Sequence, residues 1–128
     1  MFIITDSESH SVSLIQKERK NYGDVVSTFK FNLGWATGSV RVVASSERME
    51  ALSNSIDSIL TSTLNRVEFI NEDGNLDISL LVKSGGVVEF RAVAMPNMID
   101  EDRIEIYLCG EIKSSPYQHD YDCCRPVI

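Results

Sequence analysis

Two histidines, His10 and His119, are the side chains of this 128-residue sequence best suited to proton transfer near neutral pH. A catalytic serine, threonine or cysteine needs such a base beside it, yet both histidines lie outside the segments whose pattern predicts a core. The sequence also lacks a Gly-x-Ser-x-Gly elbow, a glycine-rich phosphate loop and a His-Glu-x-x-His helix. We therefore expect a protein that is not an enzyme and that binds no cofactor.

A cluster of potential metal ligands lies near the end of the sequence. It consists of His119, Asp120, Asp122, Cys123 and Cys124. A structural zinc site usually draws spaced pairs of ligands from two chain segments, which adjacent cysteines in a polar tail do not supply. Three cysteines, two of them adjacent, also make a poor disulfide framework and are typical of reduced thiols in a cytosol. The sequence thus predicts no bound metal and a cytoplasmic location.

Acidic residues are concentrated in the second half of the sequence. Residues 65–128 carry 12 acidic and 6 basic side chains, whereas residues 1–64 carry 7 acidic and 6 basic ones, and the net charge of the whole is −7. This excess argues against binding to nucleic acid or to anionic lipid, because both need clustered lysine and arginine. An acidic surface attracts a basic protein partner and speeds association, although the same charge also serves solubility.

The strand predicted at residues 103–112 gives part of this charge a defined surface. Its alternation points Ile104, Ile106 and Leu108 toward the core, and the residues between them toward solvent. The acidic run just before this strand is interpreted either as a solvated loop or as oxygen ligands for a hard cation, although the calcium-loop pattern is absent. We predict a partner-binding surface formed by Asp100, Glu101, Asp102, Glu105, Tyr107 and Glu111.

One amphipathic helix is predicted at residues 47–64. Its apolar residues recur at intervals of three and four, as one face of a 3.6-residue helix requires: Met49, Leu52, Ile56, Ile59, Leu60 and Leu64. Ser45 or Ser46 can cap its start, and the opposite face is small and polar. We expect this helix to pack on a sheet with its polar face in water.

Strand patterns lie on both sides of this helix. They cover residues 11–17, 25–33, 39–44, 66–71, 76–82, 87–94 and 103–112. The connections are too short for parallel crossovers, so we predict an α+β fold with a mainly antiparallel sheet of six to seven strands. Residues 1–112 then form a single domain and residues 113–128 an irregular tail. Trp35, at the end of a strand, is expected to be partly buried. No apolar run approaches the ~20 residues of a membrane span, and the start does not resemble a signal peptide.

The order of these elements resembles that of the WapI-type bacterial immunity proteins over residues 39–112. The residues that carry the resemblance are Val40-Arg41-Val42-Val43-Ala44, the helical Met49, Leu52, Ile56 and Leu60, then Arg66-Val67-Glu68-Phe69, Leu76-Asp77-Ile78-Ser79-Leu80 and Gly86-Val87-Val88-Glu89-Phe90. The resemblance implies a cytoplasmic protein that binds and blocks a cognate toxin domain, and it implies no catalytic residues.

Two main functions follow from these observations. The first is a non-enzymatic binding protein, an immunity protein whose acidic sheet face neutralises a basic toxin domain. The alternative is a small-molecule binding domain with an apolar pocket lined by Phe29, Phe31, Phe90 and Met49. An assembly role through an exposed edge strand near Arg103 is a further interpretation. The sequence predicts no oligomeric state.

Overall fold

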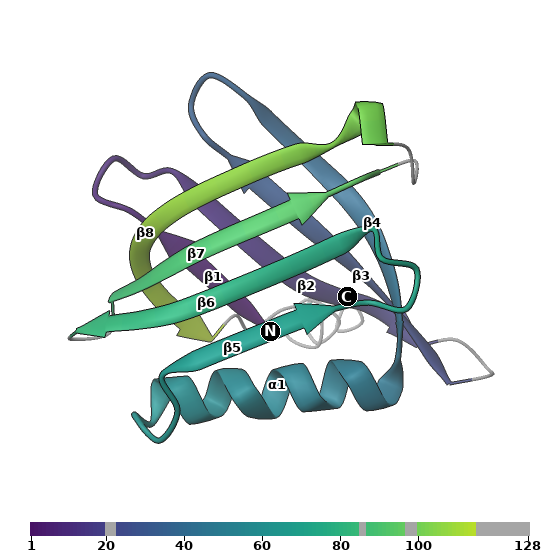
Figure 1. The fold of residues 1–128 in the computed structure, drawn as a ribbon, viewed down its shortest axis with the longest axis horizontal. Coiled ribbons are helices and arrows are strands. Elements are labelled where there is room, and N and C mark those ends of the chain that lie inside the picture. Colours follow the sequence, from purple (N-terminus) through teal and green to yellow (C-terminus); the bar gives the residue numbers. More distant parts are fainter. Residues whose placement is uncertain (20–22, 85–86, 97–99, 115–128) are drawn as a thin grey trace, which may run out of the picture.

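The computed structural model describes residues 1–19, 23–84, 87–96 and 100–114, which form an eight-stranded antiparallel sheet and one α-helix (Figure 1). In chain order the elements are β1 (Phe2–Thr5), β2 (Ser11–Arg19), β3 (Asp24–Asn32), β4 (Thr37–Ser45), α1 (Ser46–Leu60), β5 (Arg66–Ile70), β6 (Leu76–Ser84), β7 (Val87–Ala94), the 3-10 turn η1 (Asp100–Asp102) and β8 (Ile104–Ser114). The predicted α+β class with an antiparallel sheet is confirmed.

The predicted number of strands, six to seven, is wrong because β1 was not anticipated. This strand has four residues, which is too short to display an alternating pattern. It exists because it pairs with two longer strands, β2 on one side and β8 on the other. At the other end of the chain β8 runs to Ser114, two residues beyond the predicted strand end. The rest of the predicted tail, residues 115–128, lies outside the described residues, as does the cluster of potential metal ligands within it.

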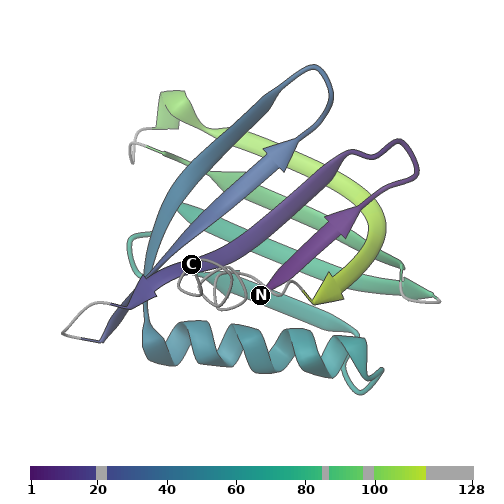
Figure 2. The ribbon, with the colours of Figure 1, turned by 180° about the vertical axis from the view of Figure 1, so that it is seen from behind.

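The sheet follows the strand order β4-β3-β2-β1-β8-β7-β6-β5, so its two edges are β4 and β5. These two strands are consecutive in the chain, and α1 connects them. The sheet is strongly curled: β5–β8 lie in front of β1–β4 in Figure 1 and behind them in Figure 2. The helix runs along the opening between the two edges and contacts β3, β4, β5 and β8. It therefore covers one end of the interior.

The helix is shorter than predicted. Ser45 caps it by accepting a hydrogen bond on its side chain from the Arg48 N–H, at 3.3 Å, and the residues facing the sheet are buried as expected. It ends at Leu60, because Ser62 adopts a positive φ of 64° and its N–H donates to the Ile59 carbonyl, three residues back, in place of the carbonyl four residues back. Leu60 and Leu64, which the apolar spacing placed inside, are exposed as a result.

The interior is filled by side chains from both halves of the sheet. Phe29 and Phe90 are fully buried and stack with ring centroids 6.2 Å apart, and Phe2 lies 6.2 Å from Phe90. Ile106 and Leu108 point inward from β8, as its alternation predicted. Burying each of these side chains contributes about 1.5–3 kcal/mol to the free energy of unfolding, which makes this interior the main source of stability.

A glycine allows β8 to bend where β1 meets it. β1 pairs with β8 from Glu111 onward, and a side chain at Gly110 would collide with the Thr5 carbonyl and lie 2.9 Å from the Asp6 nitrogen. Figure 1 shows β8 curving sharply over its second half. On the N-terminal side of this bend β1 no longer pairs with β8. Residues 104–110 of β8 therefore extend beyond β1 and keep only β7 as a described neighbouring strand.

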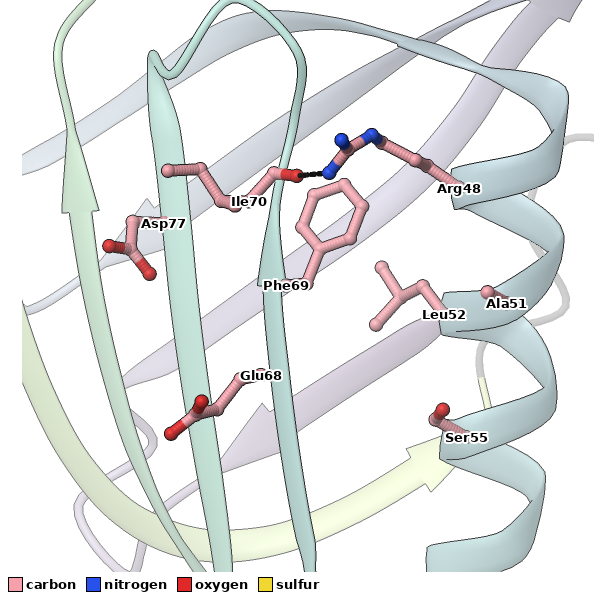
Figure 3. Close-up of a pocket in the computed structure, with 8 residues that line it drawn as sticks. All are labelled: Arg48, Ala51, Leu52, Ser55, Glu68, Phe69, Ile70 and Asp77. Atoms are coloured by element: carbon pink, nitrogen blue, oxygen red, sulfur yellow. Dashed lines mark hydrogen bonds between the residues drawn. The ribbon is translucent and has the colours of Figure 1, made fainter.

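Both edges of the sheet are covered by side chains as well as by the helix. On β4, the Val43 carbonyl accepts a hydrogen bond from the Asn71 amide at 3.0 Å, and the Arg41 carbonyl accepts one from the Asn75 amide at 3.2 Å. On β5, the Ile70 carbonyl accepts a hydrogen bond from the Arg48 guanidinium at 2.8 Å (Figure 3). These contacts satisfy carbonyls that have no neighbouring strand.

Candidate binding surface

The residues predicted to bind a partner lie on η1 and on the outer face of β8. Within η1, Glu101 and Asp102 are exposed. Along β8, Glu105, Tyr107 and Glu111 are all exposed, and Tyr107 has 57% of its surface accessible. Asp100 belongs to the same short turn. The predicted orientation of these side chains on β8 is therefore confirmed, and their role in binding stays a prediction.

Two arginines reduce the negative charge of this surface. Arg103 lies beside Glu105, with Nε and Oε2 2.9 Å apart, and Arg91 on β7 places its guanidinium carbon 5.3 Å from the centre of the Tyr107 ring. Arg91 and Tyr107 face one another across the two strands. The exposed Arg103–Glu105 ion pair and the exposed Arg91–Tyr107 cation–π contact contribute little to stability, up to about 1 kcal/mol each. The two arginines instead change the electrostatic potential, which is less negative along β8 than a count of its acidic residues suggests.

Two hollows flank Glu105 and Tyr107. The first, of about 450 Å³, lies on the β7 side and includes Arg91. The second, of about 490 Å³, lies on the opposite side of β8, where β1 has left the sheet, and we call it the β8 groove. It is lined by Asp6, Ser7, His10, Leu33, Trp35, Glu105, Ile106, Tyr107, Leu108 and Cys109. Two carboxylates and no lysine or arginine occur in that lining.

Trp35 is the most exposed large apolar side chain of the β8 groove, at 87%, so its expected partial burial is wrong. It lies at the tip of the turn between β3 and β4, which is closed by a hydrogen bond from the Leu33 N–H to the Ala36 carbonyl at 2.9 Å. The Asn32 side chain accepts a hydrogen bond from the Gly34 N–H, and Gly34 has a φ of 84°. This tight turn projects Trp35 into solvent.

Asp6 and His10, in the loop between β1 and β2, form a pair that the sequence analysis did not identify. Asp6 Oδ2 lies 3.1 Å from His10 Nδ1, while Asp6 Oδ1 accepts hydrogen bonds from the Glu8 and His10 N–H groups. Partial burial raises the pKa of Asp6, but these two N–H groups and the imidazole outweigh it and lower the pKa below its ordinary value. The sequence pattern that could have predicted this pair is an aspartate four residues before a histidine in a serine-rich turn.

The same loop contains a candidate metal cluster. The ligand atoms of Asp6, Glu8 and His10 all lie within 4.8 Å of one another. The Asp6 oxygens, however, already accept hydrogen bonds within the loop, and those bonds account for the positions of Asp6 and His10 without an ion. The loop also contacts the β3–β4 turn, because an added Cβ at Gly34 would lie 3.3 Å from His10 Nε2. We therefore assign the cluster a structural role on one wall of the β8 groove.

A further hollow, of about 420 Å³, lies between α1 and β5 (Figure 3). It is lined by Arg48, Ala51, Leu52, Ser55, Glu68, Phe69, Ile70 and Asp77. The cation of this lining, Arg48, already has partners. Its guanidinium donates a hydrogen bond to the Ile70 carbonyl, and its Nε lies 3.2 Å from Glu72 Oε2. Hydrogen bonds from Ser45 are the main cause that lowers the pKa of Glu72, and Arg48 adds to it. These contacts attach the helix to the sheet.

The four residues of the predicted apolar pocket lie in the core. Phe29, Phe90, Phe31 and Met49 are all buried. Phe29 contacts both other rings, with centroids 6.2 Å from Phe90 and 6.4 Å from Phe31. A small ligand at this position would have to separate these rings.

Comparison with known proteins adds no assignment: no protein family, no curated protein and no solved structure matches the chain. Neither helix of the described ranges has the length and apolar character needed to cross a membrane.

Proposed function

We propose that this chain is a non-enzymatic protein-binding module that takes a basic protein partner on the β8 groove and the adjoining outer face of β8. The partner is a toxin domain that the chain blocks, as in the immunity proteins that the sequence resembles. The observation that carries the proposal is the pair of exposed aromatic residues, Trp35 and Tyr107, in a groove whose charged lining consists of the carboxylates of Asp6 and Glu105.

The aromatic pair supports binding because the two exposed rings line one hollow, and exposed apolar surface that is gathered in one place marks an interaction site. Tryptophan and tyrosine are enriched among the residues that dominate the affinity of protein interfaces. In this chain the two rings come from the β3–β4 turn and from β8, and they line the same hollow. They supply apolar contact area on a surface that is otherwise polar.

The charge supports a basic partner. The chain has a net charge of −7, and the β8 groove adds local carboxylates to this overall field. Such a field raises the association rate of a positively charged partner and is screened by salt. The free, exposed thiol of Cys109 favours a reducing compartment, so we also propose a cytoplasmic location.

The test is to express candidate toxin domains from genes that neighbour the gene of this chain and to measure their binding by calorimetry at 50 and 300 mM NaCl. We expect tight binding that weakens at least tenfold at the higher salt concentration. Glu105→Lys should weaken binding at least tenfold, whereas Glu68→Lys is the matched control with the same change of charge. Glu68 is also an exposed strand residue paired with an arginine, but it lies on β5. Equal effects of the two variants, or affinity that is indifferent to salt, would contradict the proposal.

A further inference from the structure

The edge of β8 is open along the β8 groove. β7 pairs with β8 over residues 104–111, whereas β1 pairs with it only over residues 111–114. Within the described part of the chain, residues 104–110 of β8 therefore have a neighbouring strand on one side alone. Alternate N–H and C=O groups of this segment face the β8 groove, because the hydrogen-bonding groups of a strand point to its two sides in turn.

This open edge differs from the edges of the sheet that the chain covers. β4 is covered by the buried amides of Asn71 and Asn75, and β5 by Arg48 and the helix. β2 also has a single neighbour beyond Leu14, but the sequence there, Lys17-Glu18-Arg19, is net basic. Exposed strand edges invite pairing with another chain, and proteins usually cover them. Of these two uncovered edges in the described part of the chain, the one on β8 lies beside the exposed aromatic residues.

We propose that residues 104–110 of β8 receive an extended, basic segment of a partner protein as an added antiparallel strand. This inference rests on the proposed function and specifies how the partner binds. The added strand would take the position that β1 vacates, and β1 runs antiparallel to β8 on that same side. Its main chain would bond to β8, as in other cases of binding by strand addition.

The side chains around the edge fit such a strand. Successive side chains of a strand point to opposite faces. The side chains of an added strand would lie among Glu105 and Tyr107 of β8 and Asp6, Leu33 and Trp35 of the two neighbouring turns, which line the same groove. The groove thus offers two carboxylates beside apolar and aromatic surface, which suits a segment in which basic and apolar residues alternate.

Charge also selects the occupant. A second copy of this chain would bring a net charge of −7 to an acidic groove. The chain's own residues 115–128 contain two aspartates and one arginine and are therefore net acidic as well. Both are disfavoured relative to a basic segment of another protein.

The experiment uses the full chain and three seven-residue peptides with acetylated and amidated ends. The first alternates lysine and valine, beginning and ending with lysine. The second carries backbone N-methyl groups on its valines, and the third carries them on its lysines. In an added strand only one set of N–H groups faces β8, so one methylated peptide should bind at least tenfold more weakly than the other. Amide hydrogen exchange should slow for alternate residues within 104–110, and a peptide of alternating glutamate and valine should not bind.

The outcomes separate strand addition from the proposed function. Equal affinities of the two methylated peptides, protection outside residues 104–110, or no binding of the lysine peptide would overturn strand addition. If the toxin domain nevertheless binds in a salt-dependent way and Glu105→Lys weakens that binding, the proposed function stands without strand addition. If neither the domain nor the peptide binds, both fail.

Discussion

The side-chain amide of Asn71 donates a hydrogen bond to the side-chain carbonyl of Asn75 at 2.6 Å, and both residues are buried. The remaining groups of the pair bond to main-chain atoms: Asn71 Oδ1 accepts from the Leu76 N–H, and each amide donates to a carbonyl of β4. The turn between β5 and β6 thereby takes the place of a strand beside β4. A pair of side chains closes the curled sheet at this end.

Asn71→Ala should lower the free energy of unfolding by about 2 kcal/mol, because it leaves the Asn75 carbonyl and the Val43 carbonyl without their donor. Unfolding in urea, followed by circular dichroism, measures this change. Asn54→Ala is the matched control, since Asn54 is exposed on α1, and it should change stability by less than about 0.5 kcal/mol. Equal effects of the two substitutions would show that the buried pair does not close the sheet.

Gly110→Ala should destabilise the protein by about 2 kcal/mol or more, because the added methyl group meets main-chain atoms of Thr5 and Asp6 that cannot move independently. Cys109→Ala, at the exposed neighbouring position, is the control and should be nearly neutral. Thermal unfolding of both variants provides the measurement. A Gly110→Ala protein as stable as the wild type would mean that β1 and β8 can separate at this bend without cost.

Periodicity predicted the helix and seven of the eight strands, because those elements are long enough for a buried face to repeat in the sequence. β1 could not be predicted in this way, since its four residues are fixed by pairing with strands distant in the chain. The outward direction of Glu105 and Tyr107 followed from the alternation of β8. The β8 groove did not, because Trp35, His10 and Asp6 reach it from two separate turns. Their approach depends on how far the sheet curls, which no local pattern records.

The Asp6 carboxylate should make stability depend on pH in the acid range. Its pKa in the folded chain lies below the ordinary value, so its contribution is fully present above about pH 5 and is lost as pH falls through the folded pKa. Asp6→Asn should therefore be less stable than the wild type at pH 7, and the difference should shrink toward pH 3. Urea unfolding at several pH values measures it, and Asp73→Asn, an exposed residue with the same change of charge, serves as control. A constant difference between the two variants across this range would contradict the expectation.

Arg48 should matter more for stability than its exposure suggests. It bonds the Ile70 carbonyl and Glu72, and thereby joins the start of α1 to β5 and the following turn. We expect Arg48→Met to lower the free energy of unfolding by about 1–2 kcal/mol. Arg66→Met, which removes only the exposed pair with Glu68, should cost less than about 0.5 kcal/mol. Similar losses in the two variants would show that the contact with the Ile70 carbonyl adds nothing.

Trp35→Ala should separate binding from stability. Because 87% of this side chain is exposed, its removal should change the free energy of unfolding by less than about 0.5 kcal/mol. If the β8 groove is the binding surface, the same substitution should weaken binding of the toxin domain by about 2 kcal/mol, or roughly 30-fold. Leu81→Ala, an apolar residue on β6 with 36% exposure, is the control and should leave affinity unchanged. Unchanged affinity of the Trp35 variant would place the interface elsewhere, since a ring this exposed at the centre of an interface cannot be lost without effect.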